Sequence, residues 1–166
     1  MKFLEKNLED IIWEASNEKL QERGLNISGK KLRQLRIGNY GIADLVTFDR
    51  DYYHTEYLHP FLNITVYELK KDKAGISAFL QAIRYCRGIK SYLEKHKPHI
   101  DFSLNIVLCS KEIDTNSDYI FLCDLIRYNE YESGLINSIS NYSFDYSIDG
   151  IQFKEEKNYD LINKGF

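Results

Sequence analysis

The sequence of 166 residues lacks any long uninterrupted apolar run. Its first residues read MKFLEKNLEDIIWE, and acidic side chains interrupt each apolar stretch well before the length that a membrane helix or a secretory signal needs. We therefore expect a soluble, cytoplasmic protein with no membrane among its partners. With 43% hydrophobic and 14% aromatic residues, the chain can build the core of a single domain over residues 1–166.

Cysteine is also scarce, because only Cys86, Cys109 and Cys123 occur and they lie far apart. An odd number of cysteines and the absence of a Cys-x-x-Cys pair argue against a disulfide framework, a zinc site or an iron–sulfur cluster. We expect all three thiols to be reduced and mostly buried.

An excess of positive charge is missing as well, since the formal net charge is −3. This removes the simplest argument for binding nucleic acid, which is a strongly basic domain. The charge is nevertheless uneven: basic residues gather at 30–36 and 70–97, whereas 112–160 is rich in Asp and Glu. A solvated surface is the plain interpretation of such runs.

The spacing of apolar residues predicts a mixed fold. The expected helices cover 3–22, with Trp13 in the apolar stripe, 74–95 and 117–128. The expected strands cover 30–37, 42–48, 61–70, 102–110, 142–148 and 151–155. Residues 49–60 are polar and aromatic and are predicted to form a long connection. The fold class is therefore α/β (α+β), a mixed central sheet flanked by helices in the order α-β-β-β-α-β with a further α-β-β.

Charged residues lie unexpectedly inside one of the predicted strands. Because strand side chains alternate between faces, Glu68 and Lys70 share one face, and Asp44 lies on the matching face of the preceding strand. Two carboxylates that approach each other repel unless a cation bridges them, and oxygen ligands suit Mg²⁺ or Mn²⁺. Lys70 can then orient a metal-bound water or stabilise the charge that develops on a phosphate. The three residues together predict a site that hydrolyses phosphodiesters.

This arrangement resembles the PD-(D/E)xK nuclease superfamily, whose core is an α-β-β-β-α-β unit with Asp on one strand and Glu-x-Lys on the next. The closer likeness is to the catalytic domain of NucS/EndoMS-like endonucleases. It covers roughly residues 4–109, through the motifs LED, GIADLV, YELKKDKAG and QAIRY. The resemblance implies a restriction-endonuclease-like core. It also implies a deoxyribonuclease that depends on Mg²⁺ (or Mn²⁺) and attacks DNA with a metal-activated water. An endonuclease is expected rather than an exonuclease.

The resemblance also implies individual roles for residues. The catalytic residues that it implies are Asp44, Glu68, Lys70 and the helical carboxylate Glu9. The metal ligands that it implies are Asp44, Glu68, Glu9 and the backbone carbonyl of Leu69. Gln81 and Tyr85 match a Gln-x-x-x-Tyr motif that supports the site or contacts DNA, and their spacing places them on one helix face. Basic residues around the expected hairpin of strands 30–37 and 42–48 and around the expected helix 74–95, including Arg36 and Arg84, are expected to neutralise DNA phosphates.

Each of these residues can also be interpreted as purely structural. Glu9 can be one more exposed helical carboxylate, Gln81 and Tyr85 can lie on the helix surface or at the core edge, and the charged cluster can be a structural ion pair. The Tyr and His residues of 49–60 either stack on bases or belong to a surface hairpin.

Other functions stay open for the whole chain. One is a catalytically silent nuclease-fold module that binds nucleic acid or a protein partner, and another is a regulatory protein that works through an acidic surface. NucS-like proteins carry a separate N-terminal domain for DNA binding and dimerisation, which these residues do not include. Mismatch or branched-DNA specificity therefore does not transfer, and we expect a homodimer or a partner protein to hold duplex DNA.

Overall fold

A computed structural model describes residues 3–53, 59–114, 118 and 134–157. The helices are α1 (Glu5–Glu14), α2 (Asn17–Glu22) and α3 (Ile76–His96), and η1 (Gly38–Tyr40) is a short 3-10 turn. The strands are β1 (Lys30–Arg36), β2 (Ile42–Tyr53), β3 (His59–Ala74), β4 (Asp101–Ile113), β5 (Ser138–Ser147) and β6 (Gly150–Glu156).

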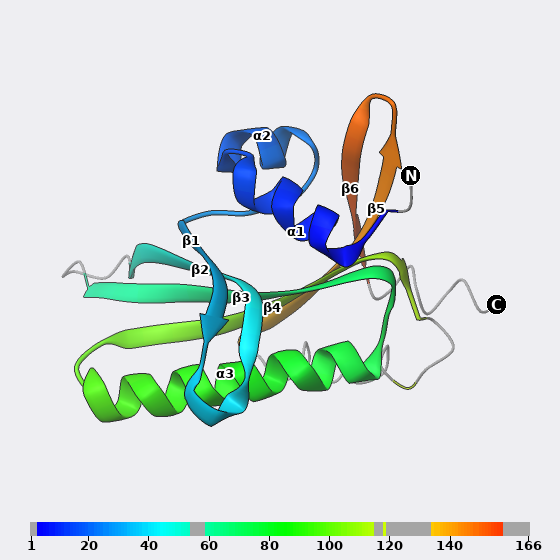
Figure 1. The fold of residues 1–166 in the computed structure, drawn as a ribbon. Helices are drawn as coiled ribbons and strands as arrows, with labels where there is room; N and C mark the ends of the chain where they lie inside the picture. Colours follow the sequence, from blue (N-terminus) through cyan, green and yellow to red (C-terminus); the bar gives the residue numbers. More distant parts are fainter. Residues whose placement is uncertain (1–2, 54–58, 115–117, 119–133, 158–166) are drawn as a thin grey trace.

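The six strands form one sheet in the order β1-β2-β3-β4-β5-β6. The first three strands are antiparallel, β3, β4 and β5 are parallel, and β6 returns antiparallel to β5. Helix α3 joins β3 to β4 and covers one face of the sheet, while α1 and α2 lie on the other side (Figure 1). The expected mixed sheet flanked by helices is confirmed. The helix predicted over 117–128 falls, apart from residue 118, outside the described residues.

Two apolar layers hold the sheet between the helices. Ile64 and Val66 of β3 belong to the layer that packs on α3, and Tyr67 and Leu69 belong to the layer that packs on α1. This alternation follows from the period of two along a strand. It assigns the face of each β3 side chain, and places Glu68 on the same side as Val66.

The N-terminal helix expected from the sequence is two helices, which corrects the prediction. Ser16 begins α2 as its N-cap, and its hydroxyl accepts a hydrogen bond from the Lys19 backbone N–H at 3.2 Å. Trp13 is 38% exposed rather than part of the core. The buried apolar residues of α1 are Leu8 and Ile12, and Trp13 lies beside them at the edge of the buried face, one turn after Glu9.

The connection predicted over 49–60 is largely paired strand. Asp49 pairs with Asn63, and the ladder continues outward to the pair of Tyr53 and His59. Polar composition favoured a loop in the sequence, but a hairpin that extends beyond the core needs no apolar face to keep its backbone ladder. The described part of this stretch is therefore a hairpin, and residues 54–58 lie outside the described residues.

The closing hairpin is confirmed. Ser147 pairs with Gly150, whose φ of 99° is the left-handed conformation that glycine adopts without strain. Strand β5 begins at Ser138, earlier than expected, because its first residues pair with β4. Among the cysteines, Cys86 and Cys109 are buried and free, and Cys123 lies outside the described residues. Within the described chain, no helix combines the length and apolar character needed to cross a membrane.

Candidate metal-dependent active site

The predicted acidic residues lie where β2 and β3 separate. The ladder between these strands runs as far as the pair of Leu45 and Tyr67. Beyond it, the Leu69 backbone N–H donates to Oδ2 of Asp44 at 3.2 Å. The carboxylate of Asp44 thus takes the place of a backbone acceptor, and this bond fixes it beside the strand that carries Glu68.

Glu68 is fully buried and has one charged partner. Its Oε1 accepts a hydrogen bond from Nζ of Lys70 at 2.7 Å. Its Oε2 is buried and has no hydrogen-bond partner in the described residues. An unsatisfied buried carboxylate oxygen is costly, and native structures contain few such atoms. A cation or a water beside Oε2 would remove this cost.

Burial and the charges of neighbouring carboxylates raise the pKa of both carboxyl groups. The pKa of Glu68 is raised to about 7, mainly by burial. The charge of Asp44 also raises it, whereas the hydrogen bond from Lys70 lowers it. Burial also raises the pKa of Asp44, with contributions from Glu9 and Glu5, although the Leu69 N–H and Lys70 oppose it. The site is therefore short of positive charge.

Lys70 stays protonated in this environment. Partial burial disfavours its ammonium form, but the hydrogen bond to Glu68 and the charges of Glu68, Glu5 and Asp44 outweigh burial, so the pKa of Lys70 is raised. A lysine that is held as a cation can stabilise negative charge but cannot serve as a base near neutral pH.

Glu9 is 9% exposed, so it is not one more exposed helical carboxylate. Its Oε1 accepts a hydrogen bond from Nε of Arg33, and its Oε2 accepts one from Nε2 of Gln34 at 3.0 Å. Arg33 also donates to Asp10 and so ties α1 to β1 at two points. Both oxygens of Glu9 are thus engaged by β1, and a direct bond from Glu9 to a metal would require it to leave these partners.

Three residues near the site were not predicted from the sequence. Oε1 of Glu5 lies 3.8 Å from Nζ of Lys70, and Arg33 and Gln34 hold Glu9. Glu5 and Glu9 are one helical turn apart, and this spacing could have indicated a shared acidic face. The contacts of β1 carried no such signal, because they depend on how α1 packs on the sheet.

The backbone of Gln34 is in an unusual conformation. Its φ is 50°, a left-handed value that no other described residue except glycine adopts. It lies between the pairs of Arg33 with Leu45 and Leu35 with Ala43, and this register places it opposite Asp44. Left-handed backbone at a non-glycine residue costs about 1–3 kcal/mol and is found more often at functional sites.

Gln81 and Tyr85 lie together on α3, with Nε2 of Gln81 donating to the Tyr85 hydroxyl at 2.7 Å. Tyr85 is buried in the layer between α3 and the sheet, which is the face of Glu68. A Cβ added to Gly41 would lie 2.9 Å from Tyr85 Cε1, so the ring packs against the chain just before β2. The core-edge interpretation fits Tyr85, which supports the strand that carries Asp44. A DNA contact by this pair stays a prediction.

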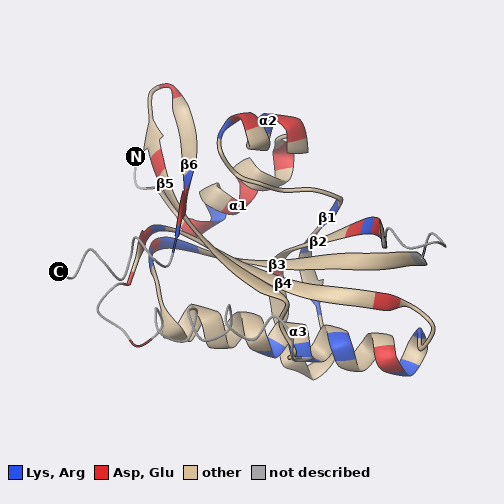
Figure 2. Ribbon diagram, turned by 180° about the vertical axis from the view of Figure 1, so that it is seen from behind, with Lys and Arg blue, Asp and Glu red and all other residues tan. Residues whose placement is uncertain are grey.

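Arg36 and Arg84 are exposed, on β1 and α3 respectively. Figure 2 shows Lys and Arg along α3 and near the ends of β3 and β4, where Lys70, Lys71 and Lys73 occur. Exposed positive charge thus lies on more than one element of the fold, and this is compatible with phosphate contacts.

The donor set can be compared with the needs of a metal ion. Within the described ranges, no group of three or more His, Cys, Asp or Glu side chains is arranged to hold a metal. Asp44, Glu68 and the Leu69 carbonyl remain as ligand candidates. The N–H and C=O of a strand residue point to the same side, so this carbonyl lies on the Asp44 side of β3. Mg²⁺ commonly takes one or two carboxylates and keeps several waters, and the unpartnered Glu68 oxygen fits that chemistry.

Comparisons of the chain with protein-family models, with curated proteins and with solved structures found no match. The resemblance to PD-(D/E)xK nucleases therefore stays a prediction that rests on the motifs and on the site geometry.

The ion pairs of Arg33 lead to a stability prediction. Arg33→Ala should lower the free energy of unfolding by about 1–3 kcal/mol, because it leaves the buried Glu9 carboxylate without its charged partner. Urea unfolding at pH 7 measures the change. Arg36→Ala is the matched control on the same strand, since Arg36 is exposed, and should change stability by less than about 0.5 kcal/mol. Equal effects would mean that Arg33 does not fasten α1 to the sheet.

Proposed function

We propose that this chain is a metal-dependent nuclease of the PD-(D/E)xK type that hydrolyses DNA phosphodiester bonds, as an endonuclease. One observation carries the proposal: at the point where β2 and β3 separate, Asp44 lies beside a buried Glu68 that is paired with Lys70 and keeps one unpartnered oxygen. Structural ion pairs normally satisfy the oxygens that they bury, whereas this one leaves a place for a cation.

The order of elements also supports the family. The PD-(D/E)xK core runs α-β-β-β-α-β, and α1, β1, β2, β3, α3 and β4 follow that order with the short α2 added after α1. Asp44 lies on the second strand and Glu68 and Lys70 on the third, as the motif requires. We infer from this a restriction-endonuclease-like core.

Each residue has a distinct part in the proposed reaction. Asp44, Glu68 and the Leu69 carbonyl would hold Mg²⁺ or Mn²⁺, which supplies a Lewis acid and lowers the pKa of a bound water. Lys70 would orient the attacking water or stabilise the charge that grows on the phosphate. Glu9, held by Arg33 and Gln34, would keep the acidic end of α1 in place. Tyr85 would position β2 through its contact with Gly41.

An incubation with DNA tests the proposal. Purified protein is mixed with supercoiled, linear, single-stranded or branched DNA in the presence of Mg²⁺, Mn²⁺ or EDTA. We expect cleavage of at least one form with metal and none with EDTA. Asp44→Asn, purified in the same way, should be inactive and so exclude a contaminating nuclease. Salt-sensitive DNA binding without cleavage would identify the chain as a catalytically silent module instead. The absence of both DNA binding and cleavage would reject the proposal.

A further inference from the structure

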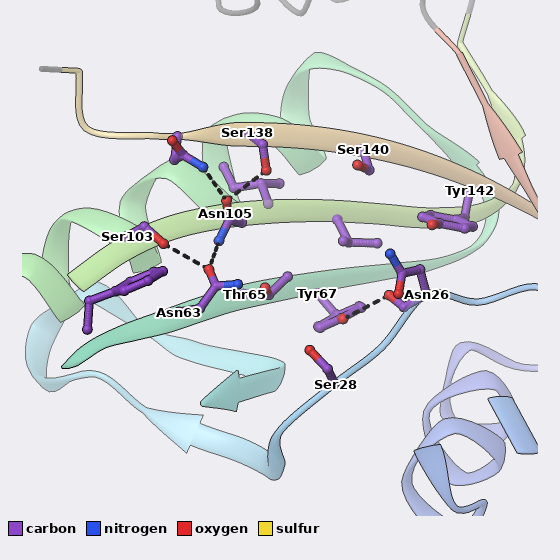
Figure 3. Close-up of a pocket in the computed structure, with 14 residues that line it drawn as sticks. Asn26, Ser28, Asn63, Thr65, Tyr67, Ser103, Asn105, Ser138, Ser140 and Tyr142 are labelled. Carbon is purple, nitrogen blue, oxygen red and sulfur yellow. Dashed lines mark hydrogen bonds between the residues drawn. The ribbon is translucent and has the colours of Figure 1, made fainter. Parts of the chain in front are cut away.

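A polar groove lies on the sheet face opposite α3, apart from the acidic site. It has a volume of about 360 Å³ and crosses β3, β4 and β5, with Asn26 and Ser28 of the α2–β1 segment along one side (Figure 3). Thr65 and Tyr67 line it from β3. Because side chains alternate along this strand, they face away from the side on which Glu68 lies.

The position of the groove is unusual for polar residues. β3, β4 and β5 pair in parallel, and parallel strands are nearly always covered by apolar packing on both faces. Here α1 covers only part of this face, through residues such as Leu69 and Cys109. The remainder presents mostly amide and hydroxyl groups, with a few apolar side chains such as Phe61 and Val107 among them. This departure favours a surface that binds a ligand over one that only completes the core.

Hydrogen bonds hold the polar side chains in fixed orientations. Asn105 is 7% exposed, its Nδ2 donates to Oδ1 of Asn63 and its Oδ1 accepts from the Ser138 hydroxyl at 2.7 Å. The Ser103 hydroxyl donates to the same Asn63 oxygen at 2.8 Å. Figure 3 shows this network running across the three strands. Because both bonds use the oxygen of Asn63, its amide nitrogen is the group that it can offer to a ligand.

The residues that line the groove indicate which chemical class of ligand would bind. None of the fourteen described residues that line the groove is charged, so these residues offer no ion pair to a phosphate or carboxylate. The free amide nitrogen of Asn63 can donate to an acceptor on the edge of a base, and aromatic rings such as that of Phe61 pack on its flat face. A pocket of this volume holds a small molecule. We propose that the groove binds a nucleobase, presented as a nucleoside or as an unpaired base.

Titration with adenosine tests this site. Amide chemical shifts of ¹⁵N-labelled protein are followed as adenosine is added. We expect shifts confined to groove residues and a dissociation constant on the order of 0.1 mM, which is typical of a ligand with about 19 non-hydrogen atoms. Asn63→Ala should weaken binding at least tenfold, and Asn39→Ala, on exposed η1, should leave it unchanged.

Asn63 also takes part in the hydrogen-bond network, so a second variant keeps the test decisive if Asn63→Ala does not fold. Thr65→Val removes one hydroxyl while it keeps the side-chain shape, and should weaken adenosine at least threefold. The absence of shifts up to 10 mM adenosine, roughly a hundredfold above the expected dissociation constant, or unchanged affinity in the folded variants, would overturn the proposal. Glucose that binds as tightly as adenosine would assign a sugar instead. Adenosine monophosphate that binds more than tenfold tighter would contradict recognition by a neutral lining.

Discussion

Lys70→Ala is expected to slow DNA cleavage by roughly a hundredfold or more. Removing a group that stabilises charge mainly in the transition state typically costs about 3–4 kcal/mol of activation free energy. The variant also leaves Glu68 buried without its cation, so the pKa of Glu68 should rise further in the metal-free protein. Rates are therefore measured at saturating Mn²⁺, because a cation bound beside Glu68 keeps this carboxylate ionised in both proteins.

Lys154→Ala is the matched control, because Lys154 is an exposed lysine on β6 whose Nζ lies 3.7 Å from a carboxylate oxygen of Glu156. It should cleave within about threefold of the wild-type rate, since surface ion pairs contribute little. Lys70→Ala should still bind Mn²⁺, because the change removes none of the proposed ligands and takes a positive charge away from the site. A Lys70→Ala protein that cleaves at the wild-type rate would make Lys70 a structural partner of Glu68 and nothing more.

Glu68→Gln is expected to abolish metal binding and cleavage together, because the amide keeps the shape of the side chain but cannot supply a charged ligand. Calorimetric titration with Mn²⁺ measures the first effect, and plasmid cleavage measures the second. Glu94→Gln is the control, since Glu94 is an exposed carboxylate on α3. Full Mn²⁺ affinity in Glu68→Gln would remove Glu68 from the proposed ligand set.

The same substitution should change how stability depends on pH. The pKa of Glu68 is about 7 in the folded protein and near 4.5 in the unfolded chain. Between these values the folded protein keeps a proton that the unfolded chain has released. Metal-free protein should therefore lose up to about 3 kcal/mol of stability as pH rises from 4.5 to above 7, and none of this loss should remain in Glu68→Gln. Urea unfolding at pH 5 and pH 8 compares the two proteins, and parallel curves would contradict the raised pKa.

The neighbourhood of Asp44 and Glu68 could be predicted because it depends on short-range rules. Alternation along β2 and β3 gives each side chain its face, and the hairpin fixes which strands are neighbours. Helix α3 could also be predicted from the sequence, since its apolar stripe is long and continuous. These elements needed no knowledge of distant contacts.

Other parts depended on packing between distant segments. The bonds from Arg33 and Gln34 to Glu9 join α1 to β1, and no spacing in the sequence specifies which helical carboxylate they reach. The break between α1 and α2 came from one N-capping hydroxyl, which the apolar spacing did not reveal. The polar groove did leave a signal: Asn63, Thr65 and Tyr67 alternate with apolar residues on β3, as Ser103 and Asn105 do on β4.

Anomalous diffraction from crystals grown with saturating Mn²⁺ tests the central claim most directly. The account predicts one strong anomalous peak at roughly 2.0–2.2 Å from a carboxylate oxygen of Asp44, from Oε2 of Glu68 and from the Leu69 carbonyl, with the Lys70 ammonium beside it. Mn²⁺ bound only elsewhere, while Asp44 and Glu68 keep their present partners, would contradict it and leave the cluster as a buried ion pair.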